Sequence, residues 1–264
     1  MTEPIEEARL FLFVPGNRPS LFDKADRGDA DAVIIDLEDA VAEFDKDTAR
    51  QVASEHRIFR KPCVIRVNAP GSEHFQKDIE ALRDVEVAAI MVPKSEDPAA
   101  FKDIEHPVIA LVESTLGVAY ARELAAHNKV CRLAFGSIDY AADLGSSESR
   151  EALLMARMEL IFASRLAGCA APIDGVTATF NDEAAVESDA AYAKSLGFSG
   201  KLLIHPAQIA PARRGFRPSE KEVAWAEKVL TALQGNEGDA IQVDGEMVDR
   251  PVILRAQQIF RDAK

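Results

Sequence analysis

Eight short apolar runs recur along the chain, each separated from the next by a polar turn and a longer stretch with helical patterning. The runs are LFLFV (10–14), AVIIDLE (32–38), CVIRV (63–67), AAIMV (88–92), VIALV (108–112), CRLAF (131–135), IDGVT (173–177) and KLLIH (201–205). Strands that alternate with helices pair in parallel through right-handed crossovers. Eight such strands in roughly 200 residues predict an α/β fold, a closed (β/α)₈ TIM barrel.

The stretches between these runs carry helix signals. They cover residues 45–56, 74–83, 117–127, 149–168 and 183–196. In SESREALLMARMELIFASRLAG, serines stand at the start, apolar residues recur at three-to-four spacing, and Gly168 stands at the end. The alternative is a doubly wound open sheet, but the GxGxxG turn typical of that fold does not follow the first apolar run. The pattern therefore favours the barrel.

The alternation of short apolar runs and helical stretches ends at residue 216. RPSEKEVAWAEKVLTALQ predicts an amphipathic helix with Trp225 as its packing anchor, GNEGD predicts a turn, and AIQVDGEMVDRPVILRAQQIF predicts a hairpin followed by a helix. We therefore divide the chain into a barrel domain, residues 1–216, and a C-terminal helix–hairpin–helix extension, residues 217–264. We expect the extension to act as a lid or as an oligomer contact.

Composition excludes several classes of function. The chain has 31 Lys and Arg against 44 Asp and Glu, a net charge of −13, which disfavours binding to nucleic acid or to an anionic membrane. Its three cysteines lack CxxC spacing, and its N-terminus lacks an apolar signal region. We expect a cytoplasmic protein with no nucleic-acid or membrane partner.

Polar residues gather where the apolar runs end, which is where a barrel enzyme carries its chemistry. They are Pro15-Gly16-Asn17-Arg18, Asp36, Glu38, Asp39, Arg66, Asn68, Pro93-Lys94, Glu113, Gly136-Ser137-Ile138-Asp139 and His205-Pro206. One charged residue at a strand end means little, but charges at nearly every strand end favour an active site.

Two of these residues, Glu113 and Asp139, predict a metal site. Each follows an apolar strand, and the two strands are neighbours in the proposed barrel. Two carboxylates with room for water suit Mg²⁺, and the histidines show no HxxxH or HxH pairing that would favour zinc. The alternative is that Glu113 forms a structural ion pair with Arg66 or Lys94.

Arg66 lies inside a strand, where a cation has to face a polar barrel mouth. Its planar guanidinium suits a carboxylate or a developing oxyanion, and the alternative is a salt bridge to Glu38. By strand alternation Asp36 and Glu38 should share a face, while Asp39 points away. A structural role for His205 is at least as well supported as a catalytic one.

The chain resembles the HpcH/HpaI aldolase and citrate lyase β-subunit family, and within it the stand-alone CitE-like acyl-CoA lyases. The motifs that carry the resemblance are, in order, LFVPGNRPSLFDKA, DAVIIDLEDAVAEFDKDTAR, VIRVN, IMVPKSE, ALVESTLGV, AFGSIDYAADLG, GFSGKLLIHPAQI and GEMVDRPVILRAQ. The resemblance implies a (β/α)₈ barrel, a bound Mg²⁺, and the cleavage or formation of a carbon–carbon bond beside a thioester.

The resemblance also implies roles for the residues of the barrel mouth. Glu113 and Asp139 would bind Mg²⁺. Arg66 would bind the 2-oxo acid or its oxyanion, and Glu38 would orient Arg66 and a metal-bound water. Many relatives have an acidic residue directly before the metal aspartate, where this chain has Ile138.

Three further residues receive roles from the resemblance. Arg18 and Lys24 would bind the phosphates of coenzyme A, and Asp249 of the extension would be the acid/base that protonates the thioester enolate or deprotonates acetyl-CoA. A remote phosphate contact contributes to ground state and transition state alike, so it should mainly affect KM.

The motifs and the resemblance lead to three alternative hypotheses for the function. The first is a Mg²⁺-dependent lyase or synthase for malyl-, methylmalyl- or citramalyl-CoA, acting on a 2-oxo acid such as glyoxylate, pyruvate or oxaloacetate and an acyl-CoA. The second is a citrate lyase β subunit that cleaves citryl-ACP to oxaloacetate and acetyl-ACP, and the third is a non-catalytic barrel with a regulatory role. We expect a homo-oligomer, a trimer or hexamer.

Overall fold

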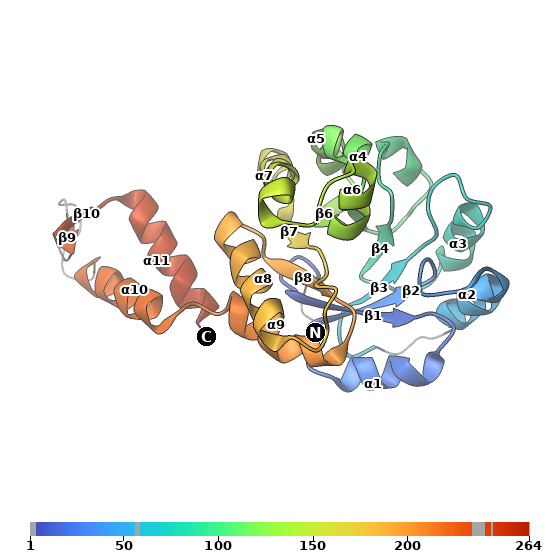
Figure 1. Cartoon of the computed structure of the whole chain (residues 1–264), viewed down its shortest axis with the longest axis horizontal. Coiled ribbons are helices and arrows are strands. Elements are labelled where there is room, and N and C mark those ends of the chain that lie inside the picture. Colours follow the sequence, from blue (N-terminus) through green and yellow to red (C-terminus); the bar gives the residue numbers. More distant parts are fainter. Residues whose placement is uncertain (1–3, 56–58, 234–240, 244, 264) are drawn as a thin grey trace. The chain divides into compact units, whose positions relative to one another are not determined.

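The computed structural model describes residues 4–55, 59–233, 241–243 and 245–263 (Figure 1). Its contacts divide the chain into two compact units, Met1–Gly215 and Phe216–Lys264. Each unit has its own core.

The first unit is a closed barrel of eight parallel strands, as predicted. The strands are β1 (Leu10–Pro15), β2 (Ala32–Asp36), β3 (Cys63–Arg66), β4 (Ala89–Val92), β5 (Val108–Val112), β6 (Val130–Phe135), β7 (Ala170–Asp174) and β8 (Gly200–Leu203). Each strand pairs with the next in the sequence, and β1 pairs with β8, so the sheet has no edge strand.

Helices lie outside the strands (Figure 1). They are α1 (Phe22–Arg27), α2 (Lys46–Glu55), α3 (Phe75–Leu82), α4 (Thr115–Ala119), α5 (Ala121–Ala126), α6 (Ser137–Leu144), α7 (Arg150–Ala167), α8 (Glu183–Leu196) and α9 (Ile209–Phe216). Short 3₁₀ turns occupy η1 (Pro19–Leu21), η2 (Glu43–Asp45), η3 (Pro98–Phe101) and η4 (Pro206–Gln208). The one helix predicted over 117–127 is divided in two at Tyr120, whose backbone leaves the helical region at φ −102° and ψ 14°.

The prediction for the seventh strand was wrong in position, because β7 covers 170–174 and not 173–177. Pro172, which cannot donate a backbone hydrogen bond, accepts one through its carbonyl from the backbone N–H of Ser199. At Gly175 a Cβ atom would collide with the Ser137 hydroxyl. The chain therefore passes close to the start of α6 where a longer strand was predicted.

The interior of the barrel is apolar and is closed at the amino ends of the strands by a buried arginine. Phe11, Val64 and Leu111 belong to one buried cluster in this interior. Arg132 is 0% exposed, and its guanidinium donates to the carbonyls of Ile5, Ala8 and Ala171 and to the Ser199 hydroxyl. These bonds satisfy a buried cation that has no carboxylate partner in the described part of the chain.

The second unit is the predicted helix–hairpin–helix. It consists of α10 (Glu220–Leu233), the antiparallel pair β9 (Ile241–Val243) and β10 (Glu246–Val248), and α11 (Arg250–Asp262). Ala226, Val229, Val248, Ala256 and Ile259 form its core, and Trp225 packs against them. The predicted GNEGD turn lies outside the described residues. Among the helices that the structure describes, none combines the length and the apolar character needed to cross a membrane.

Candidate active site at the carboxyl ends of the strands

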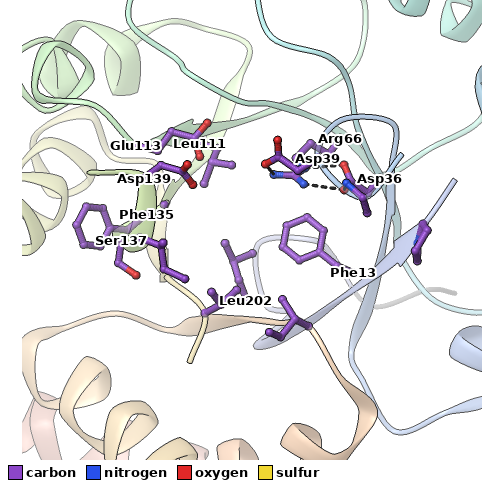
Figure 2. Close-up of a pocket in the computed structure, with 16 residues that line it drawn as sticks. Phe13, Asp36, Asp39, Arg66, Leu111, Glu113, Phe135, Ser137, Asp139 and Leu202 are labelled. Atoms are coloured by element: carbon purple, nitrogen blue, oxygen red, sulfur yellow. Dashed lines mark hydrogen bonds and ion pairs between the residues drawn. The ribbon is translucent and has the colours of Figure 1, made fainter. Parts of the chain in front are cut away.

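A cavity of about 390 Å³ lies at the carboxyl ends of the barrel strands (Figure 2). Its lining residues are Phe13, Pro15, Asp36, Asp39, Ala40, Arg66, Leu111, Glu113, Phe135, Gly136, Ser137, Ile138, Asp139, Val176, Leu202 and Ile204. Figure 2 shows Glu113 and Asp139 together on one side and Arg66 with Asp36 and Asp39 on the other. Apolar side chains supply most of the remaining wall, so the charged groups face a partly desolvated space.

Glu113 follows β5 and is held by the backbone around it. The carboxylate is 5% exposed, and its Oε1 accepts a hydrogen bond of 2.8 Å from the backbone N–H of Lys94. Lys94 has φ 46°, the one positive value at a non-glycine residue in the part of the chain described. A Cβ at Gly136 would collide with the Glu113 side chain. Lys94 thus contributes its peptide group, and no ion pair joins Glu113 to Lys94 or Arg66 in the described structure.

Asp139 stands in the first turn of α6 and lines the same cavity. Its carboxylate is exposed and makes no hydrogen bond or ion pair with any other described side chain. Burial raises the pKa of Glu113 to about 8, the charge of Glu38 adds to the rise, the Lys94 N–H opposes it, and the charge of Asp139 raises it further. Two carboxylates that repel each other and face one cavity form the donor set that a hard divalent cation prefers.

Arg66 is fixed across the cavity by Asp36. Its Nε donates to Asp36 Oδ1 at 2.7 Å and its Nη2 to Asp36 Oδ2 at 2.6 Å, while the guanidinium lies 4.8 Å from the Phe13 ring centre. Burial lowers the pKa of Arg66, but the hydrogen bonds and charge of Asp36, with the charges of Glu38 and Asp39, raise it above its ordinary value. The guanidinium therefore stays charged and oriented, with N–H groups to spare for a ligand.

The sequence prediction for the residues around Arg66 was partly wrong. Asp39 was expected to point away, but it lines the cavity and its Oδ2 lies 3.4 Å from Arg66 Nη1. Asp36 is directly opposite Arg66 in the β2–β3 register, and its oxygens also accept from the backbone N–H groups of Glu38 and Ala40. These bonds turn the chain sharply after β2, so strand alternation no longer applies.

Glu38 lies beside Arg66 in a buried position. Its Oε2 is 3.0 Å from Arg66 Nη1, but the pair does not form a well-aligned hydrogen bond. Burial raises the pKa of Glu38 to about 7, Arg66 opposes the rise, and the charges of Asp39 and Asp36 add to it. Lys46 Nζ holds the loop by donating to the carbonyls of Leu37 at 2.8 Å and Glu38 at 2.7 Å. Glu38 is thus a carboxyl group that can exchange a proton near neutral pH.

A second, larger cavity of about 860 Å³ adjoins the first beside β1, α1 and α9. The two cavities share Phe13, Pro15 and Ile204. Arg18 and Lys24 line the larger one, are exposed, and make no ion pair within the described chain. Its size and largely apolar walls with a few cations suit an elongated anionic ligand.

The remaining candidates, His205 and Asp249, have structural contacts. His205 caps η4, because its Nδ1 accepts from the Ala207 N–H at 3.1 Å. Asp249 caps α11, because its Oδ1 accepts from the Val252 N–H at 3.2 Å, and its side chain is exposed. Asp249 belongs to the C-terminal unit, whereas the other predicted site residues belong to the barrel unit.

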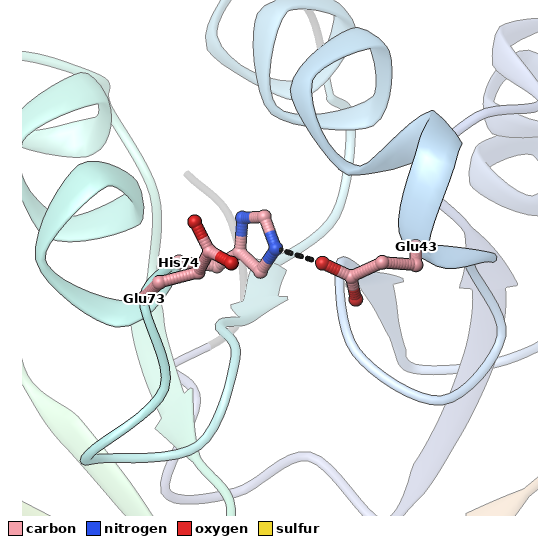
Figure 3. A group of neighbouring side chains, drawn as sticks. All are labelled: Glu43, Glu73 and His74. Carbon is pink, nitrogen blue, oxygen red and sulfur yellow. Dashed lines mark hydrogen bonds and ion pairs between the residues drawn. The ribbon is translucent and has the colours of Figure 1, made fainter.

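A group of possible metal ligands elsewhere, Glu43, Glu73 and His74, is explained by hydrogen bonding (Figure 3). His74 Nδ1 lies 3.2 Å from Arg50 Nη2, and its Nε2 lies 2.6 Å from Glu43 Oε1. A guanidinium can only donate, so Nδ1 accepts and the proton is on Nε2, which donates to Glu43. The imidazole therefore has no free lone pair for a metal ion in this arrangement.

Comparison with known proteins agrees with this architecture. The model of the family described as HpcH/HpaI aldolase/citrate lyase matches residues 9–206. The chain belongs to this family. The family membership, the barrel fold and the assignment to a lyase-type enzyme that the motifs predicted are thereby confirmed.

Three relatives of this HpcH/HpaI-family chain illustrate the similarity. A citrate lyase subunit beta-like protein of Mycobacterium tuberculosis is 36% identical over 261 residues, which cover 96% of this chain and 94% of the relative. The (3S)-malyl-CoA thioesterase of Cereibacter sphaeroides is 33% identical and covers 97% of this chain and 94% of its own. The crystal structure of M. tuberculosis CitE with magnesium, acetoacetate and coenzyme A has a TM-score of 0.89 at 34% identity, covering 98% of this chain and 99% of that one.

Sequence reasoning missed two members of the site in this HpcH/HpaI-family chain. For Asp36 the sequence predicted only the face of the strand, and not the bidentate bond with Arg66. Lys94 was considered only for its ammonium group, and not for the backbone N–H that donates to Glu113. Aligning the ends of the second and third apolar runs would have placed Asp36 beside Arg66. The turn signal after AAIMV, Pro93-Lys94, does not show which way the Lys94 N–H points.

Proposed function

We propose that the protein is a Mg²⁺-dependent carbon–carbon lyase or synthase that interconverts a 3-hydroxyacyl-CoA with a 2-oxo acid and an acyl-CoA. The observation that carries the proposal is the cavity in which Glu113 and Asp139 face the fixed guanidinium of Arg66. Glu113 and Asp139 would hold the ion, and their chemistry fits it. The presence of magnesium and coenzyme A in the CitE crystal structure supports this assignment.

Each residue of the site has a separate role in the proposed reaction. Mg²⁺ bound to the two carboxylates would supply a Lewis acid for the oxygen of the reacting carbonyl. In the condensation direction Asp249 removes a proton from the carbon beside the thioester, and the resulting enolate attacks the 2-oxo carbon. Arg66 stabilises the alkoxide that develops. Glu38, which is buried beside Arg66, is our candidate to give that alkoxide a proton, and cleavage runs the same steps in reverse.

The lining of the cavity favours a monocarboxylic oxo acid. Arg66 is the one cation among the lining residues, and Asp36 already takes two of its N–H groups. The second carboxylate of a dicarboxylic oxo acid would contact apolar side chains such as Ile138 and Leu202, or the acidic groups of the site. An unpaired charge is costly in either place. We therefore favour glyoxylate or pyruvate over oxaloacetate, and malyl-, methylmalyl- or citramalyl-CoA over a citryl thioester.

The larger cavity is our proposed site for coenzyme A. Arg18 and Lys24 would bind its phosphates, and the shared residues Phe13, Pro15 and Ile204 would let the thioester reach the metal side. In a chain of net charge −13, such local cations are needed to hold a polyanion.

We also propose that the C-terminal unit closes the site of a neighbouring copy in a homo-oligomer, a trimer or hexamer. Asp249 is exposed on a unit with its own core. Its Oδ1 caps α11, and we propose that its Oδ2 completes the active site of a neighbouring copy. Such closure would exclude water from the enolate.

A panel assay tests the proposed function. The protein is mixed with Mg²⁺, acetyl- or propionyl-CoA, and glyoxylate, pyruvate or oxaloacetate, and new thioesters are detected by mass spectrometry. We expect malyl-, methylmalyl- or citramalyl-CoA to form only with Mg²⁺, and little product from oxaloacetate. A preference for citryl-ACP or co-purification with an acyl carrier protein would instead favour a citrate lyase β subunit, and no product from any pair would favour the regulatory barrel.

A further inference from the structure

A third cavity, of about 250 Å³, lies beside the candidate active site and is called here the β7–β8 cavity. Its lining residues come from the start of α6, from α7, β7, α8 and β8, and from the loops that adjoin them: Ser137, Glu148, Arg150, Leu153, Arg157, Asp174, Val176, Thr177, Ala178, Thr179, Ala185, Asp189, Tyr192 and Lys201. None of its charged residues belongs to the machinery described above. A water occupies about 30 Å³ in the liquid, so the cavity has room for more than a single water.

The deepest ionisable groups of the β7–β8 cavity are two bases and one carboxylate. Arg157, Asp174 and Lys201 are 8%, 1% and 1% exposed. Arg157 Nε donates to Asp174 Oδ1 at 2.9 Å, and Lys201 Nζ lies 3.8 Å from Asp174 Oδ2 while donating to the carbonyl of Gly175 at 2.6 Å. Two buried basic side chains thus share one buried carboxylate. Burial lowers the pKa of Lys201, and the charges of Asp174 and Asp189 oppose that shift, so a further negative charge would favour the ammonium form.

The outer charged groups of the cavity make most of their contacts with one another. Arg150 pairs with Asp189 at 3.1 Å and stacks on Tyr192 at 4.6 Å, and Asp189 also accepts from the Thr177 hydroxyl at 2.9 Å. Asp189 therefore pairs with Arg150, and its charge also attracts Lys201 at longer range. Glu148 is exposed, where water and salt screen its charge.

One donor in the cavity wall lacks an acceptor. Arg157 Nη1 is buried and has no hydrogen-bond partner among the described residues. The guanidinium lies 5.2 Å from the centre of the Phe135 ring and 5.7 Å from the centre of the Tyr192 ring. A charged N–H buried without an acceptor is strongly unfavourable, so a ligand oxygen at this position would remove a penalty.

We propose that the β7–β8 cavity binds one small monovalent oxyanion of the carboxylate type. One of its oxygens accepts from Arg157 Nη1, and its negative charge stabilises the charged forms of Arg157 and Lys201. Ser137 and Val176 line both this cavity and the active-site cavity, and Ser137 is the first residue of the helix that carries Asp139. The anion thus occupies the space behind one wall of the proposed metal site and stabilises the folded barrel.

Thermal unfolding of the metal-free protein tests this site. Tm is followed in EDTA while formate or acetate replaces chloride at constant ionic strength, with phosphate as a separate series that distinguishes a phosphate site from a carboxylate site. We expect a saturable rise in Tm with formate and acetate, because a ligand that binds only the folded state stabilises it by mass action. Phosphate should have a weaker effect.

Two variants and one control assign the effect to the cavity. Lys201→Met removes the buried amine that would hold the anion as an ammonium, and Arg157→Lys keeps a basic side chain but removes Nη1, so each should weaken the apparent anion affinity at least tenfold. Arg122→Met, which breaks an exposed pair with Glu159, should bind as the wild type does. A response that is equal in all four proteins, or no saturable response in the wild type, would mean that the cavity holds only water and would overturn the proposal. Should Lys201→Met fail to fold, Arg157→Lys alone decides.

Discussion

Replacing Glu113 by glutamine should stabilise the metal-free protein. Burial is the main cause that raises the pKa of Glu113 from 4.5 to about 8. Between these values the folded chain holds a proton that the unfolded chain has lost, so the free energy of unfolding falls as the pH rises. One pKa unit corresponds to about 1.4 kcal/mol, so at pH 7 this carboxyl group costs the folded state on the order of 3 kcal/mol. Glutamine has the same shape and no charge to bury, and should remove most of that cost.

Urea unfolding at pH 5 and pH 8, with EDTA or with Mg²⁺, measures the pH dependence of stability without metal and the stabilisation by Mg²⁺. Without metal, the wild type should lose stability from pH 5 to pH 8, and Glu113→Gln should lose distinctly less. With Mg²⁺ at one hundred times its Kd, the wild type should gain about 2.7 kcal/mol and the variant far less. Glu123→Gln, at an exposed position, is the control and should match the wild type. An unchanged pH slope and an unchanged Mg²⁺ response in Glu113→Gln would refute the reasoning.

Three further substitutions test the other roles. Arg66→Lys cannot make the bidentate bond to Asp36, so kcat/KM should fall at least about 100-fold, or about 2.7 kcal/mol, and a loss under threefold would argue against oxyanion binding by Arg66. Replacing Arg18 and Lys24 together by Gln should raise the thioester KM about tenfold with kcat nearly unchanged, and a normal KM would place the phosphates elsewhere. Asp249→Asn should retain Mg²⁺ binding but lose turnover and solvent exchange of the acetyl-CoA methyl protons. Mixing it with inactive Glu113→Gln subunits should restore some activity, and no recovery in verified mixed oligomers would place Asp249 in the site of its own chain.

The barrel could be predicted because a parallel strand buried on both faces must be apolar at nearly every position. VIALV at 108–112 coincides with β5, and the LFLFV run begins where β1 begins. The seventh strand was misplaced because its true sequence, AAPID, contains a proline and only one β-branched residue. Its position depends on pairing with its neighbours, which local sequence preference does not show.

The sequence predicted those site residues that come soon after the end of a strand. Glu113 directly follows β5, and Asp139 lies in the first turn of the helix that follows the neighbouring strand β6, so proximity in a barrel follows from their order. The partner of Arg66 could not be chosen in this way, because Asp36 is selected by the β2–β3 register and by the turn that its own oxygens stabilise. The raised pKa of Glu113 depends on burial, which also requires the folded structure.

Diffraction from crystals grown with Mn²⁺ and pyruvate tests the central assignment most directly, because Mn²⁺ takes the same oxygen ligands as Mg²⁺ and can be located by its anomalous signal. We expect a peak between the carboxylates of Glu113 and Asp139, with the pyruvate carboxylate and keto oxygen completing the ligands and Arg66 within hydrogen-bond distance of the pyruvate. The peak should disappear in Glu113→Gln crystals. A metal held by Asp36 and Asp39, or pyruvate bound away from Arg66, would contradict the account.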